Sequence, residues 1–314
     1  MAVHPHGTTS DFSELRRVIV VMECKVPDYS IAPEDSAPVV IGGVGGSGTR
    51  LVAQILQQQG VQFGGEMNDS LDNLWFSLLF VRRTIVLKSP QEIRQLVWLF
   101  INAMRDGLPV PKDLLPLIDA AARYDRGPAL RKSVLQVARR SILQGSPPSN
   151  EQSLWGWKQP NTHILVPLLA QCIPQMKYIY VVRNGLDMAF SYNQNQLKYF
   201  WGDMLLEGDV DSSPRNSLRY WVASYKRILT DRALLHDRLY ILDFDLLCRS
   251  PVEELNKLNQ FLNLEVHRET LEKIAQSIVI PDSTGRYRDQ DCRQLCSEDV
   301  EFVRTLGFEV PSVF

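Results

Sequence analysis

The sequence predicts an α/β fold in which a parallel β-sheet carries helices on both faces. Two observations support this fold class. Short segments rich in β-branched and aromatic residues alternate along the chain with segments whose apolar residues have helical spacing. A glycine-rich stretch at 42–48 separates the first clear strand candidate from a helix candidate. Alternating strands and helices favour parallel pairing, because each connecting helix covers a face of the sheet.

The strand candidates are short apolar runs, and we expect about five of them to form the sheet. They lie at 18–22, 39–41, 61–63, 84–88, 155–158, 177–182 and 239–242. The run 177–182, with the sequence KYIYVV, is the strongest signal.

Helix candidates occupy most of the intervening chain. Apolar spacing predicts a helix from Leu51 that stops at Gly60 and one over 165–172 that Pro167 kinks or restarts. Ser250, with Pro251 and Glu253 after it, predicts a capping box at the start of another helix.

The expected organisation is one domain over residues 37–314. A mostly helical insertion occupies about 91–145, and a loop or linker follows at 145–149. Residues 1–36 form an N-terminal extension to which the sequence assigns no role.

Composition excludes several functional classes. The 34 basic and 36 acidic residues give a net charge of −2, so no nucleic-acid partner is expected. No apolar stretch is long enough for a membrane span, and the N-terminus lacks a secretory signal. The five scattered cysteines favour reduced thiols in a cytoplasmic protein, and the dispersed histidines predict no metal site.

The glycine-rich segment predicts a loop that binds an anion. Gly43–Arg50 has the frame of a phosphate-binding P-loop, with backbone N–H groups and a helix start to attract negative charge. Thr49 stands where a nucleotide triphosphatase needs lysine, which weakens a kinase interpretation. A glycine turn without a ligand is the simpler alternative.

A second motif follows the strong strand at 177–182. Arg183 is expected at the carboxyl end of that strand, where open α/β sheets bind ligands, and Ser191 in the next helix. Arginine offers a fork of donors to phosphate, and a hydroxyl adds another hydrogen bond. Taken alone, an arginine at the end of a strand is more often the partner of a salt bridge, and that is the alternative for Arg183.

The two motifs together resemble those of the sulfotransferases that use 3′-phosphoadenosine-5′-phosphosulfate (PAPS). The resemblance covers residues 38–290 and includes GWKQPN at 156–161, LDFDLLCRSP at 242–251 and STGRYR at 283–288. It implies a P-loop NTPase-like sulfotransferase fold. It also implies that the cofactor and its product 3′-phosphoadenosine-5′-phosphate (PAP) contact the loop, the arginine motif and a late closing loop. These implied cofactor residues are Gly45, Gly46, Ser47, Gly48, Thr49, Arg50, Arg183, Ser191, Gly285 and Arg286.

One departure from the family pattern concerns catalysis. Most relatives carry a proline and a basic residue where this chain has Gly45 and Gly46, so we expect Arg50 or Lys158 to supply the positive charge. Lys158 is then the candidate that stabilises the leaving group.

The resemblance makes Glu66 the candidate general base, as in some Golgi-type relatives. A salt-bridging or capping role is the alternative for Glu66. Asp69 and Asp72 are expected on one face of the next helix, with Asp69 better explained as its N-cap, and His163 is a weaker candidate base.

The implied function is sulfuryl transfer to an acceptor hydroxyl or amine of a small molecule, glycan or lipid. The alternatives are a P-loop kinase of small molecules and a silent homologue that binds the nucleotide without turnover. The sequence leaves the acceptor and the oligomeric state open.

Overall fold

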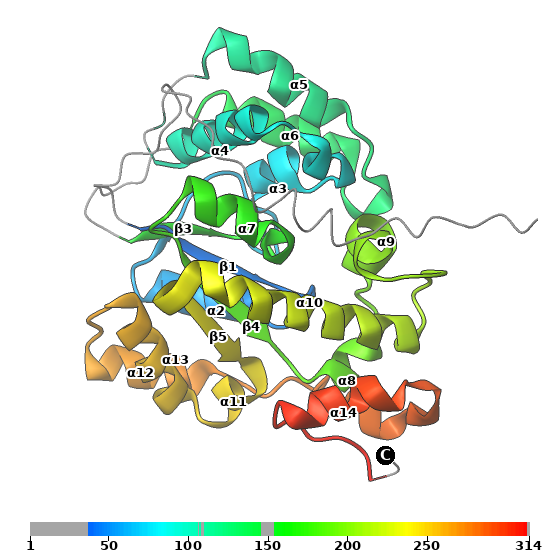
Figure 1. The fold of residues 1–314 in the computed structure, drawn as a ribbon. Coiled ribbons are helices and arrows are strands. Elements are labelled where there is room, and N and C mark those ends of the chain that lie inside the picture. Colours follow the sequence, from blue (N-terminus) through cyan, green and yellow to red (C-terminus); the bar gives the residue numbers. More distant parts are fainter. Residues whose placement is uncertain (1–36, 106, 108–109, 146–153, 313–314) are drawn as a thin grey trace, which may run out of the picture.

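The computed structural model describes residues 37–105, 107, 110–145 and 154–312. Its centre is one five-stranded sheet with the order β2-β3-β1-β4-β5, in which every pairing is parallel (Figure 1). The strands are β1 (Val39–Gly43), β2 (Gln62–Phe63), β3 (Trp155–Lys158), β4 (Lys177–Val182) and β5 (Leu239–Asp243). The predicted fold class is therefore confirmed. The candidate strand 18–22, the extension 1–36 and most of the loop 145–149 lie outside the described residues.

The strand predicted at 84–88 is wrong. Residues Arg83–Leu87 form a 3₁₀ helix, in which Ile85 N donates to Arg82 O at 3.1 Å. Leu87 is 79% exposed, so the segment presents only part of its apolar surface to the interior. β-Branched composition alone does not create a strand where no neighbouring strand offers an edge.

Helices cover both faces of the sheet, as Figure 1 shows. They are α2 (Thr49–Gln58), α3 (Leu74–Phe80), α4 (Pro90–Arg105), α5 (Leu115–Arg123), α6 (Lys132–Ile142), α7 (Thr162–Cys172), α8 (Gly185–Ala189), α9 (Gly202–Leu205), α10 (Pro214–Leu235), α11 (Phe244–Arg249), α12 (Pro251–Leu262), α13 (Arg268–Ser277) and α14 (Ser297–Thr305). A π-helix (η4) spans Gln196–Trp201. None of the helices described here has the length and apolarity to cross a bilayer.

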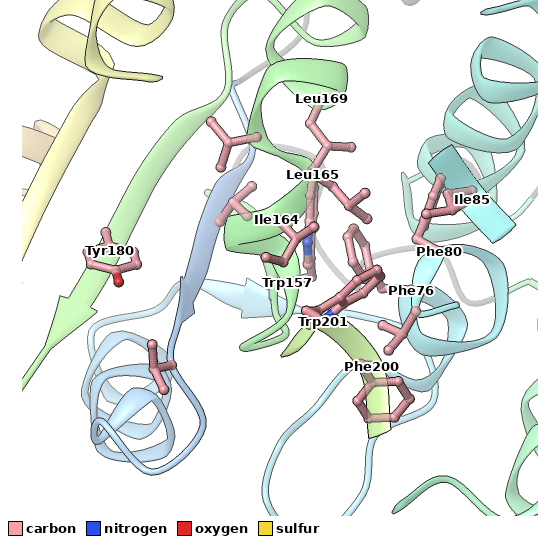
Figure 2. Close-up of a cluster of buried hydrophobic side chains, with 14 of the residues drawn as sticks. Phe76, Phe80, Ile85, Trp157, Ile164, Leu165, Leu169, Tyr180, Phe200 and Trp201 are labelled. Atoms are coloured by element: carbon pink, nitrogen blue, oxygen red, sulfur yellow. The ribbon is translucent and has the colours of Figure 1, made fainter. Parts of the chain in front are cut away.

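The alternation of side chains along β1 divides the core into two clusters. Val39 and Ile41 join the cluster formed with α2, α12 and α13, whereas Val40 joins the cluster formed with α3–α7 and α10. The second cluster is rich in aromatic rings, among which Phe76, Trp157 and Trp201 lie close together (Figure 2). Burial on both faces explains why these strands are almost continuously apolar.

One helix start and one cap differ from the sequence prediction, whereas α12 begins at Pro251 as expected. α7 begins at Thr162 and continues through Pro167 without a break. Ser250 precedes α12, but its side chain caps nothing, and Glu253 pairs with Lys257 at 2.7 Å instead of closing a capping box.

The prediction for Asp69 is also wrong. Asp69 and Asp72 lie in a loop before α3, and the N-cap of α3 is Asn73, whose side chain accepts from Phe76 N at 2.7 Å. The amide of Asp72 is bound by the Asn68 side chain at 2.9 Å, which shapes the loop as a turn rather than a helix.

A close approach of two central strands makes Gly156 sensitive to substitution. A Cβ at Gly156 would lie 1.8 Å from Val39 O. We predict that Gly156→Ala lowers the free energy of unfolding by at least about 2 kcal/mol, measured by urea unfolding, because the β1–β3 pair must separate. The control Gly60→Ala has open space but a φ of +91°, so it should cost only about 1 kcal/mol. Equal losses in the two variants would contradict the steric argument.

Candidate functional site

The loop after β1, residues 44–48, is called the glycine loop, and its backbone has the features of an anion-binding loop. Gly46 and Gly48 both have a φ of +99°, which favours glycine, and a Cβ at Gly48 would lie 2.0 Å from the Phe244 ring. Among the described residues, no acceptor bonds the backbone N–H groups of Gly46, Gly48 or Thr49. The Ser47 hydroxyl is buried and also lacks a partner. These polar groups at the start of α2 fit a negatively charged ligand.

Arg183 directly follows β4 and is nearly buried. Its Nη2 donates to Thr284 Oγ1 at 3.0 Å, and its Cζ lies 5.5 Å from the centre of the Phe244 ring. Asp187 and Asp245 each lie 3.7 Å from guanidinium nitrogens, too far for a strong hydrogen bond, and Arg183 Nε has no hydrogen-bond partner. The guanidinium thus retains capacity for an anion.

A late loop, residues 283–288, is hydrogen-bonded to the Arg183 motif, residues 183–191, through Asp187. The Asp187 carboxylate accepts from Gly285 N at 2.8 Å and from Tyr287 N at 3.3 Å. Arg286 follows Gly285, and its pKa is lowered by burial and by the positive charge of Arg183. Two cations with this mutual repulsion would be stabilised by a shared anion.

Ser191 joins the two motifs. It lies just beyond the end of α8 rather than inside the helix, and its Oγ accepts from Asn193 N at 3.2 Å. A Cβ at Gly46 would come within 3.6 Å of that oxygen. The structure therefore brings the glycine loop and the Arg183 motif together.

A second group of charges lies near the carboxyl end of β3. Lys158 Nζ contacts Asp72 Oδ1 at 2.5 Å and donates to Ser70 O at 2.9 Å, while Arg50 Nη2 donates to Ser70 Oγ at 2.6 Å. Burial lowers the pKa of Lys158, and Asp72 opposes that effect. The loop that contains Ser70 and Asp72 thus gathers both candidate cations.

Glu66 lies half-buried at the start of the same loop. Its backbone O accepts from Leu74 N at 2.7 Å, but its carboxylate makes no hydrogen bond or ion pair with another described residue. The structure does not bring the Glu66 side chain into contact with Arg50 or Lys158.

Some residues of the site escaped the sequence analysis. Thr284, Phe244 and Asp245 surround Arg183, although they lie in segments that were singled out only for their resemblance. Asp72 was considered only as a helical carboxylate. The register of the sheet was the missing signal, because it places β5 beside β4. In the described part of the chain, no three of His, Cys, Asp and Glu are arranged to hold a metal ion.

His163 is not at the open edge of this site. It lies in α7, fully buried, with Nε2 3.4 Å from Gln196 Oε1 and with no partner at Nδ1. Burial and the positive charge of Arg227 lower its pKa to about 3. A buried neutral ring supports structure and is poorly placed to take a proton from an acceptor.

Comparisons with known proteins agree on the fold. A family profile described as sulfotransferase family matches residues 38–268. The sulfotransferase domain of the olefin synthase from Synechococcus PCC 7002 superposes with a TM-score of 0.50 at 16% identity, over 90% of this chain and 99% of that domain.

Two further structures are more distant. Sulfotransferase STF9 from Mycobacterium avium has a TM-score of 0.42 at 15% identity, covering 89% of this chain and 78% of its own. A mouse sulfotransferase complexed with PAP has a TM-score of 0.40 at 15% identity, covering 84% and 70%. A sequence search of curated proteins finds no match.

The buried His163 predicts a pH dependence of stability. Its pKa falls from 6.5 in the unfolded chain to about 3, so below pH 6.5 the unfolded state binds the proton first. We predict that the wild type loses about 2 kcal/mol more stability between pH 7 and pH 5 than His163→Gln does, measured by urea unfolding. His267→Gln, which removes an exposed imidazole, is the control. Parallel pH profiles for wild type and His163→Gln would contradict the assignment.

Proposed function

The chain belongs to the sulfotransferase family, and on that premise we propose that it transfers a sulfuryl group from PAPS to an acceptor hydroxyl or amine. The observation that supports this best is the convergence of two anion sites. One is the glycine loop, and the other is formed by Arg183, Ser191 and Arg286. A nucleotide with phosphate groups at both its 3′ and 5′ ends matches two such sites.

The residues present fit this donor. The loop amides and Ser47 Oγ that lack hydrogen-bond partners among the described residues would hold its 5′ end, and the guanidinium of Arg183, whose Nε makes no hydrogen bond, would hold its 3′-phosphate. Ser191 and the loop containing Gly285 would complete the 3′ site. Bound there, the donor supplies an activated sulfuryl group.

Arg50 and Lys158 are proposed to balance charge at the reacting end. During transfer, the acceptor oxygen or nitrogen forms a bond to sulfur while the bond from sulfur to the bridging phosphate oxygen breaks. Negative charge develops on that bridging oxygen, and nearby cations stabilise it. Lys158 is held in a fixed orientation by Asp72 and Ser70 O, whereas Arg50 is exposed and anchored only at Ser70 Oγ. Lys158 is accordingly the better-oriented cation.

Glu66 is proposed to accept the acceptor's proton. Its carboxylate is half-buried and uncommitted, in contrast to Asp72, which is paired with Lys158. The proton released as the bond to sulfur forms would move to Glu66, so charge stays balanced.

The acceptor is proposed to be a small molecule, glycan or lipid. The four described cysteines are free thiols, in keeping with the proposed cytoplasmic location.

Donor binding tests the role of Arg183. In calorimetric titration with adenosine 3′,5′-bisphosphate, Arg183→Ala should bind at least about ten-fold more weakly than wild type, because a charge-assisted pair with phosphate is lost. Arg268→Ala removes an exposed arginine of α13 and should bind as wild type does. Binding of ATP with Mg²⁺ but not of the bisphosphate would favour the kinase alternative.

Turnover tests the role of Glu66 as the base. Product PAP is measured with PAPS and a panel of small alcohols, phenols and amines. Glu66→Gln should lower turnover by about 10²–10⁴-fold, because the proton acceptor is removed, with bisphosphate affinity retained. Asp69→Asn changes an exposed carboxylate of the same loop and is the control. Undiminished turnover in Glu66→Gln would remove Glu66 from this role. Bisphosphate binding without any turnover by the wild type would favour the silent homologue.

A further inference from the structure

Gln196 bonds directly to the glycine loop. Its side chain is 6% exposed, and its Oε1 accepts from Gly45 N at 3.1 Å while its Nε2 donates to Gly43 O at 3.2 Å. A single amide group therefore fixes the backbone on both sides of Val44, where β1 turns into the loop.

The amide of Gln196 is itself held by buried groups from two helices. His163 Nε2 of α7 and Tyr220 OH of α10 each lie 3.4 Å from Gln196 Oε1, and they lie 3.5 Å from each other. His163 Nδ1 has no partner, so the hydrogen-bond network assigns the proton of the neutral ring to Nε2, which donates toward Gln196. These contacts leave the Gln196 amide little freedom to rotate.

The backbone that carries Gln196 is anchored in the core. Gln196 is the first residue of the π-helix Gln196–Trp201, and such wide turns are frequent at functional sites. The last residue, Trp201, is fully buried (Figure 2), and its Nε1 donates to Asn161 Oδ1 at 2.7 Å. Gln196 thus connects the glycine loop to side chains that are packed in the core.

We propose that Gln196 is a positioning residue that sets the backbone of the glycine loop for the 5′ end of the nucleotide, an inference that rests on the proposed function. Gln196 engages Gly45 N–H and leaves the amides of Gly46, Gly48 and Thr49 for the ligand. Within the described structure, it makes no hydrogen bond to Arg183, Ser191 or Arg286. Its influence is therefore confined to the 5′ end.

The test compares two ligands that share the 3′-phosphate. Wild type and Gln196→Met are titrated with adenosine 3′,5′-bisphosphate and with adenosine 3′-monophosphate, and the melting temperature of each protein is recorded. Gln196→Met should weaken the bisphosphate about ten-fold and change the monophosphate by less than about two-fold. A merely structural role would lower the melting temperature and leave the ratio of the two affinities unchanged, which would overturn the proposal.

Two further variants keep the test decisive. Gln194→Met is the matched control, because Gln194 Nε2 also donates to backbone carbonyls, those of Met188 and Ser191, but not to the loop. Its ratio of affinities should equal that of wild type. Tyr220→Phe removes only a hydroxyl beside Gln196 and should shift the ratio in the same direction by about three-fold. A wild-type ratio in Tyr220→Phe, should Gln196→Met not fold, would overturn the proposal.

The same titrations distinguish a failure of the proposed function from a failure of the role of Gln196. If the wild type binds neither nucleotide, the proposed function fails and the role of Gln196 falls with it. If the wild type prefers the bisphosphate and both Gln196→Met and Tyr220→Phe keep that preference, only the role of Gln196 fails.

Discussion

The parallel pairing of β1 with β4 is the constraint on which the candidate site depends. Gly43 lies opposite Val181, so the loop that leaves β1 emerges beside Arg183, which directly follows the end of β4. On the other side of β1, Ile41 lies opposite Lys158. Because all five strands run in one direction, the loop after β1, Arg183 after β4 and Lys158 in β3 lie at the same carboxyl end of the sheet. A shift of this register would separate the groups without altering any of them.

The sequence predicted the sheet well because its strands are buried on both faces. Such strands are continuous apolar runs, and 177–182 was bounded correctly for that reason. The segment 84–88 has a similar composition but has no neighbouring strand, among those described, with which to pair. The composition of a segment does not show whether such a strand lies beside it in the fold. Pro167 was expected to kink or restart α7, and the helix does not restart there; Arg227 Nη2 donates to Ile164 O at 3.0 Å near the proline.

The candidate site was partly predictable for a similar reason. Local motifs carry the loop and Arg183, because a glycine turn and a residue at the end of a strand are properties of contiguous sequence. Gln196, Asp72 and Thr284 act across separations of 153, 86 and 101 residues, to Gly43, Lys158 and Arg183 respectively. No local pattern marks such partners, since a glutamine that bonds a distant loop looks like any other glutamine.

The bond from Asp187 to Gly285 has a consequence for the order in which the protein matures. The final strand of the sheet ends at Asp243, whereas the loop that completes the Arg183 motif comes about 40 residues later. As the chain leaves the ribosome, all five strands become available before that loop has been synthesised. A nascent chain can therefore pair its whole sheet while the proposed nucleotide site is still incomplete, so that the fold forms before the candidate site does.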